Sequence, residues 1–229
     1  MTHFALMLFA AGKGTRMQPL THHLPKPLIP VAGRPLIDHA LNLARQAHCA
    51  PIVVNTHYRA DQIVAHLAGQ DIRLSHEPIL LETGGGLRAA LPLLGPGPVI
   101  LLNSDAVWTG PNPLIALAQA WEPGRMDGLL MTLPAAETPD FHIPGDFLTN
   151  ADGRLTRANG RAGDAYLGAQ ILKPEDLHEI SEDIFSLNKV WDRMISRGRL
   201  FGLRHQGRWC DVGRPASIAL AEDVLRGSA

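Results

Sequence analysis

The residues best suited to chemistry lie near the start of the chain. A glycine-rich turn, Gly12-Lys13-Gly14-Thr15-Arg16, follows an apolar run, and Pro25-Lys26-Pro27 comes shortly after it. Glycines let backbone N–H groups approach phosphate oxygens closely and tolerate positive φ. An arginine can bind phosphate through two parallel hydrogen bonds, and flanking prolines restrict the backbone that carries the lysine. The pattern predicts a polyphosphate site and therefore a nucleotide-dependent enzyme.

The turn fits neither of two familiar nucleotide-binding patterns. The Walker pattern has four residues between its glycines and then Lys-Ser or Lys-Thr, and the dinucleotide-binding pattern has a third glycine that opens a helix. Without that glycine, and without an acidic residue ~20 positions further on in a second strand, a dehydrogenase is disfavoured. Taken singly, the same residues also fit an ordinary turn with solvated cations.

Two aspartates at predicted strand ends could bind a metal ion. Asp105 closes a buried apolar run through Asn103-Ser104-Asp105, and Asp211 lies in the short segment Trp209-Cys210-Asp211. Mg²⁺ takes oxygen ligands, often one or two carboxylates with water and substrate phosphates. An aspartate at a strand end can equally form a turn or a helix cap. The histidines show no metal-ligand spacing of the His-Glu-x-x-His kind.

Alternating strands and helices must position these residues. Predicted strands cover residues 4–9, 52–54, 72–74, 99–102, 129–131, 166–172 and 200–203. Predicted helices cover residues 36–47, 61–67, 84–94, 113–121, 187–195 and 218–225, the second capped by Asp61. This order predicts βαβ units, and hence a Rossmann-like α/β fold with a mostly parallel, mixed sheet flanked by helices.

One domain is predicted for residues 1–229, because no linker or internal repeat interrupts the pattern. Residues 134–163 are rich in Pro, Gly, Asp and Asn, which indicates either an insertion that covers one side of the site or a surface hairpin. The chain is 45% hydrophobic and 19% charged with a net charge of −1. Such a composition supports a packed core and disfavours a nucleic-acid binder with a broad basic face.

The remaining composition predicts a cytoplasmic protein without a membrane segment. Two cysteines, Cys49 and Cys210, do not make a disulfide framework. The N-terminus has no basic segment followed by a long apolar one, and no apolar run approaches the ~20 residues of a membrane helix.

The segment Ala10-Ala11-Gly12-Lys13-Gly14-Thr15-Arg16, followed by Pro25-Lys26-Pro27, resembles the signature of the sugar-1-phosphate nucleotidyltransferase family. Those enzymes join a nucleoside triphosphate to a sugar 1-phosphate and release pyrophosphate. The resemblance implies that Ala10, Ala11, Gly12, Lys13, Gly14 and Thr15 bind the nucleotide. It also implies that Arg16 and Lys26 are catalytic, Arg16 at the leaving pyrophosphate and Lys26 at the α-phosphate.

Three later segments resemble the same family. Residues 77–86 are similar to the loop that lines base and sugar, which implies nucleotide contacts for Glu77, Thr83 and Gly84. Asn103-Ser104-Asp105 is similar to the family's metal-binding motif, and Trp209–Gly213 to the segment whose acid completes the metal site. The resemblance therefore implies that Asn103 contacts the nucleotide and that Asp105 and Asp211 hold Mg²⁺. No nucleophilic side chain is required, because positioning and charge neutralisation dominate such transfers.

The loop Leu81–Gly86 most resembles short bacterial enzymes that make UDP-N-acetylmuramate from N-acetylmuramate 1-phosphate in peptidoglycan recycling. This resemblance implies UTP and that sugar phosphate as partners, with Asp146 and Gly168 as sugar contacts. It implies no nucleic-acid or membrane partner, and a monomer or small homo-oligomer.

Two departures from the family pattern keep alternatives open. Relatives carry a Glu-Lys-Pro segment where this chain has residues 159–165, in which Arg161 is the cation present, and Glu77 stands where several relatives have Gln. A mannose-1-phosphate guanylyltransferase is therefore the alternative enzyme. A non-catalytic nucleotide-sugar sensor is the alternative from another class, although a sensor would be expected to lose the Arg/Lys pair or the metal carboxylates.

Overall fold

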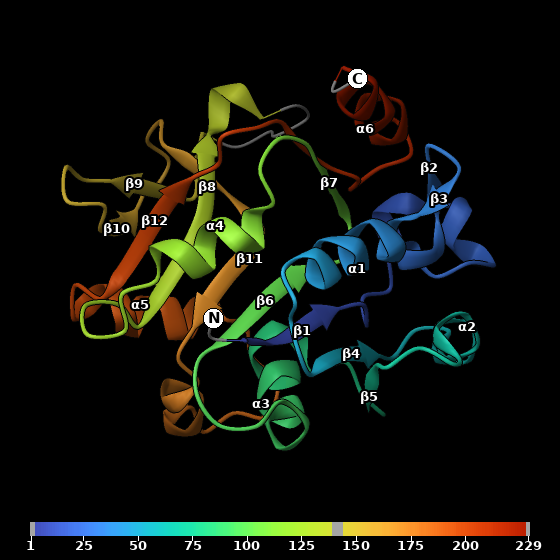
Figure 1. The fold of residues 1–229 in the computed structure, drawn as a ribbon, viewed down its shortest axis with the longest axis horizontal. Coiled ribbons are helices and arrows are strands. Elements are labelled where there is room, and N and C mark those ends of the chain that lie inside the picture. Colours follow the sequence, from blue (N-terminus) through green and yellow to red (C-terminus); the bar gives the residue numbers. More distant parts are fainter. Residues whose placement is uncertain (1–2, 139–143, 228–229) are drawn as a thin grey trace.

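A mixed β-sheet forms the centre of the computed structural model, which describes residues 3–138 and 144–227 (Figure 1). Its parallel part has the spatial order β6 (Val99–Asn103), β1 (Ala5–Phe9), β4 (Ile52–Thr56) and β5 (Arg73–His76). In register, Leu6 pairs with Ile52 on one side and Ile100 on the other. Continuous apolar runs form these strands because both faces of a parallel sheet are covered by helices.

The other part of the sheet is largely antiparallel. The long strand β11 (Asp164–Leu172) pairs antiparallel with β6 and with β8 (Gly128–Pro134), and β12 (Leu200–Arg204) runs parallel to β8. The register of β11 against β8 shifts between Tyr166 and Gln170. The fold is thus the predicted Rossmann-like α/β fold, with a sheet more mixed than its apolar runs alone suggest.

Helices cover both faces of the sheet. Alternate residues of β1 point to opposite sides: Leu6 and Leu8 pack with α1 (Leu36–Gln46) and α4 (Pro113–Ala120), which lie in front of the sheet in Figure 1. Met7 points the other way, towards α3 (Glu82–Leu94) and α5 (Asn188–Ser196). Burial of both stripes fixes the register of β1 and with it the point where the loop after Phe9 begins.

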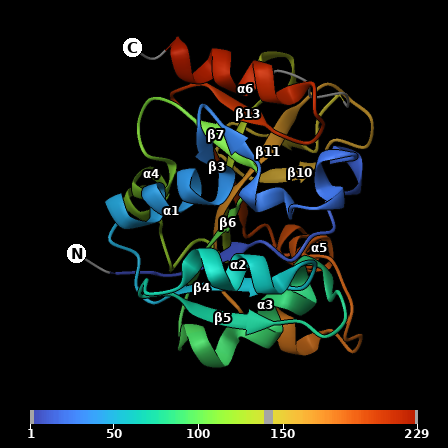
Figure 2. The same cartoon turned by 90° about the vertical axis from the view of Figure 1, so that its right-hand side faces the viewer.

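A smaller layer joins early and late segments of the chain. Strands β7 (Ala106–Trp108) and β13 (Trp209–Asp211) pair antiparallel beneath α6 (Ser217–Arg226), as Figure 2 shows. The hairpin of β2 (Pro30–Val31) and β3 (Arg34–Pro35) lies beside them. Their shared core includes Met17, Val107 and Val212. The layer therefore carries the segment after the glycine turn, and the predicted acidic residues, to one edge of the sheet.

The start of α2 and the segment 134–163 are the two places where the sequence predictions need correction or stay open. Helix α2 (Ala60–Leu67) begins after Arg59, which has φ 49°, so Asp61 lies in its first turn and does not cap it, contrary to the prediction. Residues 134–163 form a 3-10 turn (Ala135–Glu137) and the hairpin of β9 (Phe147–Thr149) and β10 (Leu155–Arg157). Residues 139–143 of this segment lie outside the described residues, and its role as an insertion over the sugar stays a prediction.

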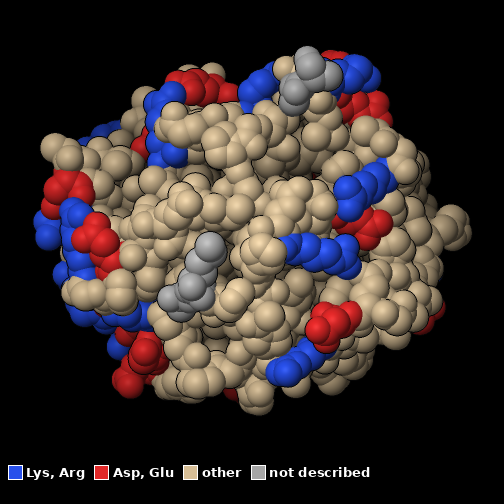
Figure 3. All heavy atoms as spheres, in the orientation of Figure 1, with Lys and Arg blue, Asp and Glu red and all other residues tan. Residues whose placement is uncertain are grey.

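The described surface agrees with the near-neutral composition. On the face that Figure 3 shows, acidic and basic side chains lie near one another and no broad basic surface is present. None of the helices in the described ranges is long and apolar enough to span a membrane.

Candidate active site

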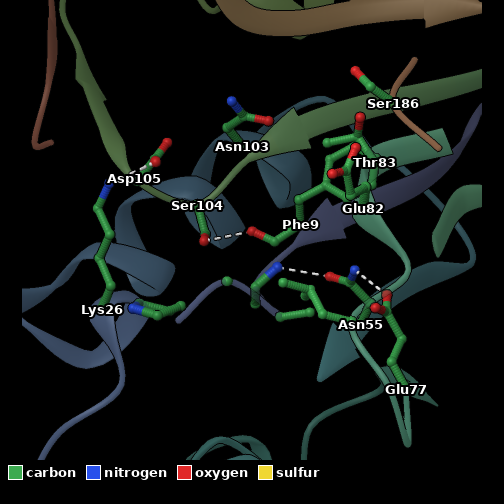
Figure 4. A pocket seen from close by; sticks show the side chains of 15 residues that line it. Phe9, Lys26, Asn55, Glu77, Glu82, Thr83, Asn103, Ser104, Asp105 and Ser186 are labelled. Atoms are coloured by element: carbon green, nitrogen blue, oxygen red, sulfur yellow. Dashed lines mark hydrogen bonds and ion pairs between the residues drawn. The ribbon is translucent and has the colours of Figure 1, made fainter. Parts of the chain in front are cut away.

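A cavity of about 360 Å³ opens where β1 and β6 end (Figure 4). After β1 the chain continues to β4, which pairs with β1 on one side, and β6 later pairs with β1 on the other side. Open α/β sheets bind ligands at such a switch point, at the carboxyl ends of the strands. The cavity is lined by Phe9, Ala10, Ala11, Gly12, Lys26, Pro27, Asn55, Glu77, Leu80, Glu82, Thr83, Asn103, Ser104, Asp105 and Ser186.

The loop after β1 folds back on itself at Gly14. This residue has φ 62°, and a Cβ there would lie 2.9 Å from Cγ2 of Thr21 and 3.0 Å from Cβ of Lys26. The hydroxyl of Thr21 donates a 2.9 Å hydrogen bond to the Gly14 carbonyl. Glycine is therefore required at position 14 by both conformation and space. The fold-back places Lys26 beside the turn, whereas Gly12 faces open space in the cavity wall.

One end of the cavity carries opposite charges in contact. Lys26, in the 3-10 turn Lys26–Leu28 between its two prolines, is 9% exposed. Its Nζ lies 2.7 Å from Oδ2 of Asp105, which follows β6. The neighbouring Ser104 hydroxyl donates a 2.6 Å hydrogen bond to the Phe9 carbonyl, tying the ends of β6 and β1 together. The predicted lysine and the first predicted acid are thus adjacent, as Figure 4 shows.

Asp211 and Arg16 approach the same end from the smaller layer. Asp211 pairs with Ala106, and the N–H of Val212 donates to the Asp105 carbonyl at 2.8 Å, so the two aspartates occupy neighbouring strand ends. A Cβ on Gly213 would lie 2.6 Å from Oδ2 of Asp211 and 3.6 Å from Nη1 of Arg16. All four predicted charged residues therefore gather at one edge of the sheet.

The donor set suits a hard divalent cation with an incomplete protein shell. In the described ranges, no three His, Cys, Asp or Glu side chains come together closely enough to hold an ion alone. Two carboxylates that leave the remaining positions to water and substrate phosphates are a common arrangement for Mg²⁺. The Asp105 carboxylate already binds one cation that lines the cavity, the ammonium of Lys26.

The opposite end of the cavity is held by buried hydrogen bonds. Asn55, at the end of β4, accepts from the Ala10 N–H at 2.7 Å and donates to Oε1 of Glu77 at 2.7 Å. Oε2 of Glu77 accepts from the Leu81 N–H at 2.9 Å. Asn55 and Glu77 are only 3% and 1% exposed. These bonds join the ends of β1 and β4 to the start of α3.

The start of α3 is covered by the segment before α5. The Phe185 carbonyl accepts from the N–H groups of Gly84 and Gly85, and the Leu187 N–H donates to the Thr83 hydroxyl at 3.0 Å. A Cβ on Gly84 would lie 2.3 Å from the Phe185 ring. The amide of Gly84, a predicted nucleotide contact, is therefore used within the protein, while Thr83 and Ser186 line the cavity.

The predicted sugar-side residues lie on and beside β11. Gly168 has φ 84°, and a Cβ there would lie 2.9 Å from Nδ2 of Asn103, which lines the cavity. Asp146 accepts a 2.9 Å hydrogen bond from the Tyr166 N–H. Burial raises the pKa of the Asp146 carboxyl, although the Tyr166 N–H and the charge of Arg157 oppose that rise. Asp146 thus braces the strand where its register shifts, next to Gly168.

The structure brings most of the predicted residues together and adds others. Eight line the cavity directly: Ala10, Ala11, Gly12, Lys26, Glu77, Thr83, Asn103 and Asp105. Lys13, Gly14, Thr15, Arg16 and Asp211 lie in the loop and strand that border its charged end. Sequence reasoning missed Asn55, Ser104 and Ser186. A polar residue directly after the apolar run 52–54 was the one available signal for Asn55, and nothing in its neighbourhood singles out Ser186.

A glycine turn after β1, a cation pair and two carboxylates at a switch point define a nucleotide-binding α/β enzyme. The family model described as the MobA-like NTP transferase domain matches residues 6–142. Together with the first relative below, this match shows that the chain belongs to the sugar-1-phosphate nucleotidyltransferase family. Substrates of this family are a nucleoside triphosphate and a sugar phosphate, and its members generally use a divalent metal ion.

Two relatives and one solved structure show what the chain is similar to. An N-acetylmuramate alpha-1-phosphate uridylyltransferase of Caulobacter vibrioides is 41% identical, over 96% of each chain. A mannose-1-phosphate guanylyltransferase catalytic subunit beta of Drosophila pseudoobscura pseudoobscura is more distant, at 28% identity over 91% of this chain and 59% of its own length. The crystal structure of HddC from Yersinia pseudotuberculosis complexed with GMP-PN shares the fold, with a TM-score of 0.78, 18% identity, and 96% and 98% of the two chains covered.

Proposed function

We propose that this enzyme transfers a uridylyl group from UTP to N-acetylmuramate 1-phosphate, giving UDP-N-acetylmuramate and pyrophosphate. The substrates are those in the name of the relative that matches 96% of both chains. The observation that supports the proposal is the contact of Lys26 with Asp105 at one end of a cavity, with Asp211 on the neighbouring strand and Arg16 near Gly213 beside it.

The charges of the cavity favour one orientation of the nucleotide. We assign the triphosphate to the charged end, against Gly12, Lys13, Gly14 and Thr15, since that end carries the cations. We assign the nucleoside to the end lined by Glu77, Thr83 and the start of α3, with Ala10, Ala11 and Asn103 as the other lining residues that contact the nucleotide. Gly84 contributes there through close packing, because its amide is bonded to Phe185.

The chain needs to supply position and charge rather than a nucleophile. An oxygen of the sugar phosphate attacks the α-phosphorus in line, the bond to the bridging oxygen breaks, and pyrophosphate leaves with that electron pair. Lys26 neutralises charge on the α-phosphate and Arg16 on the leaving pyrophosphate. Asp105 and Asp211 would hold Mg²⁺, which supplies further charge neutralisation when bound.

We assign the sugar to the side of β11. Gly168 approaches Asn103 closely, and Asp146 holds the adjacent Tyr166 amide, so both would shape this wall. N-acetylmuramate carries a lactyl carboxylate, which calls for a nearby cation. Arg161 lies in the loop between β10 and β11, where its Nε donates to the Ala158 carbonyl, and the Ala158 N–H in turn donates to the Asp146 carbonyl. Arg161 is therefore our candidate for that cation.

Pyrophosphate release from a substrate panel tests the proposal. The protein is incubated with Mg²⁺ and each of UTP, GTP, dTTP and CTP against N-acetylmuramate, N-acetylglucosamine, glucose and mannose 1-phosphates. UTP with N-acetylmuramate 1-phosphate should give the highest kcat/KM, and chelation by EDTA should abolish release. Preference for GTP with mannose 1-phosphate would establish the guanylyltransferase instead. Binding of nucleotide sugars without release from any pair would establish a sensor.

We further propose one domain over residues 1–229, with 134–163 on the sugar side, acting in the cytoplasm as a monomer or small homo-oligomer. Three apolar clusters lie against one sheet and its adjoining layer, which supports a single unit. Cys49 and Cys210 are buried thiols, and burial raises the pKa of Cys49 to about 12. Free cysteines are typical of a reducing compartment.

A further inference from the structure

We propose that Asn55 and Glu77 form a positioning pair that fixes the nucleoside end of the cavity through hydrogen bonds whose donors and acceptors can be arranged in one way only. In this role Glu77 acts on the nucleotide through its neighbours rather than by reading the base itself. The inference rests on the proposed function, because it concerns how the same cavity receives UTP.

The bonds form one continuous series across three segments. The Ala10 N–H donates to Oδ1 of Asn55, Nδ2 of Asn55 donates to Oε1 of Glu77, and the Leu81 N–H donates to Oε2 of Glu77. The three distances are 2.7, 2.7 and 2.9 Å. Both side chains are almost fully buried, so water cannot readily replace a lost partner.

The two backbone N–H groups at the ends of the series determine which side-chain groups can donate and which can accept between them. Backbone N–H groups only donate, so Asn55 must present its oxygen to Ala10 and its nitrogen to Glu77. Glu77 must then accept from both sides. An ionised carboxylate offers two acceptor oxygens and no donor, whereas a glutamine would turn an NH₂ group towards one of two donors. The glutamate at position 77 is therefore matched to the asparagine at position 55.

The series ends on residues that shape the cavity. Ala10 lines it and opens the glycine loop, and Leu81 precedes Glu82, which also lines it and has φ 59°. A residue other than glycine rarely adopts this backbone conformation without support from its surroundings. A Cβ on Gly86 would lie 2.6 Å from Oε1 of Glu77, so the third glycine of the α3 turn leaves room for the pair. The pair thus holds two facing walls of the nucleoside end at a fixed separation.

A reciprocal exchange of the two groups tests this arrangement of donors and acceptors. Asn55→Asp alone sets two carboxylates against each other, and Glu77→Gln alone sets a donor against a donor. In the double variant Asn55→Asp/Glu77→Gln, the introduced carboxylate can accept from the Ala10 N–H and from the introduced amide, whose oxygen can accept from the Leu81 N–H. We expect each single change to raise KM for UTP about tenfold, with less effect on kcat. The double variant should return KM to within about threefold of the wild-type value.

The controls separate this inference from the proposed function. Pyrophosphate release by the wild-type protein with UTP and N-acetylmuramate 1-phosphate tests the function alone. The surface change Glu122→Gln, at an exposed residue paired with Arg125 and outside the cavity lining, should leave KM unchanged.

Two outcomes overturn the inference when the wild-type protein is active. One is a double variant whose KM for UTP is raised as much as that of the worse single variant, and the other is a Glu77→Gln variant whose KM for UTP is unchanged. Circular dichroism and thermal midpoints of all variants identify any that fail to fold, and a double variant less stable than both single variants also counts against the pair.

Discussion

The ammonium of Lys26 lies 2.7 Å from the Asp105 carboxylate although 79 residues separate them in the chain. Both groups stand at the mouth of the cavity, where Lys26 is 9% exposed. A buried amine held against a carboxylate keeps one orientation, so it needs little rearrangement to meet a phosphate. Because the two groups are in contact, substitution of either residue also changes the surroundings of the other.

Asp105→Asn should lower turnover at least ~100-fold while leaving the fold intact. Asparagine keeps the shape and an oxygen for Lys26 but loses the charge that a divalent cation requires. Pyrophosphate release at saturating UTP and Mg²⁺, with circular dichroism on the same sample, measures both effects. Asp223→Asn, a change at an exposed acid of α6 paired with Arg226, is the matched control. Full activity of Asp105→Asn would remove this residue from the metal site.

Lys26→Ala should reduce kcat by about 100- to 1,000-fold, with a much smaller change in KM for UTP. The lysine is assigned to charge that develops in the transition state, so its loss affects turnover more than binding. Initial rates over a range of UTP concentrations separate the two parameters. A rise in KM alone would show that Lys26 only binds the ground state.

Gly14→Ala should destabilise the protein by about 1–3 kcal/mol, because alanine at φ 62° is strained and its Cβ meets Thr21 and Lys26. Gly12→Ala is the matched control, since nothing lies within 4 Å of a Cβ at that position. Its thermal midpoint should stay near the wild-type value while KM for UTP rises, because the methyl group enters the cavity wall. Urea denaturation of both variants measures the difference, and equal stabilities would contradict the turn geometry.

Arg161→Ala should lower kcat/KM for N-acetylmuramate 1-phosphate about tenfold and leave that for N-acetylglucosamine 1-phosphate nearly unchanged. The second sugar lacks the lactyl carboxylate, so the pair of substrates isolates the charge that Arg161 is assigned to meet. Arg125→Ala, at the edge where Arg125 bonds Glu122 and Asp152, serves as the control. Equal losses with both sugars would place Arg161 elsewhere in the mechanism.

Stability should fall as pH drops through the range where His205 gains a proton. Burial lowers the pKa of His205 below its usual value, and its Nε2 donates to the Thr109 carbonyl at 3.0 Å. Because the folded state resists protonation, the unfolded state binds the extra proton first, and stability is lost as pH falls below about 6.5. His205→Gln should reduce the difference in thermal midpoint between about pH 7.5 and about pH 5.5. The exposed His178→Gln should not change that difference.

Much of the fold follows from the apolar runs. Residues 4–9, 52–54 and 99–102 read as buried strands because both faces of a parallel sheet are covered, and the structure confirms them. The pairing of β7 with β13 could not be predicted in the same way. Strands of three residues carry almost no periodicity, and their partners are distant in the chain, so only the folded sheet brings them together.

The residues of the candidate site also fall into two groups, those that the sequence predicted and those that it did not. The charged residues were predicted from the sequence motifs and the family resemblance that these carry, and the structure brings Lys26 against Asp105. Their roles stay predictions. The roles of the glycines were not predicted, since Gly84, Gly85 and Gly86 are required by contacts with Phe185, Asp183 and Glu77 that no local pattern encodes. Asn55 was missed for the same reason: a buried amide is recognised by its partners, and those belong to other segments.

The place of β13 after the strands of the central sheet in the sequence has a consequence for biosynthesis. A ribosome has already released most of the sheet from its exit tunnel before the segment with Asp211 is made, so the emerging polypeptide can fold its glycine turn and Asp105 early. The second proposed carboxylate arrives only with β13. Under the proposed function, the nascent polypeptide should gain activity only once this segment has left the ribosome and folded, rather than gradually as it lengthens.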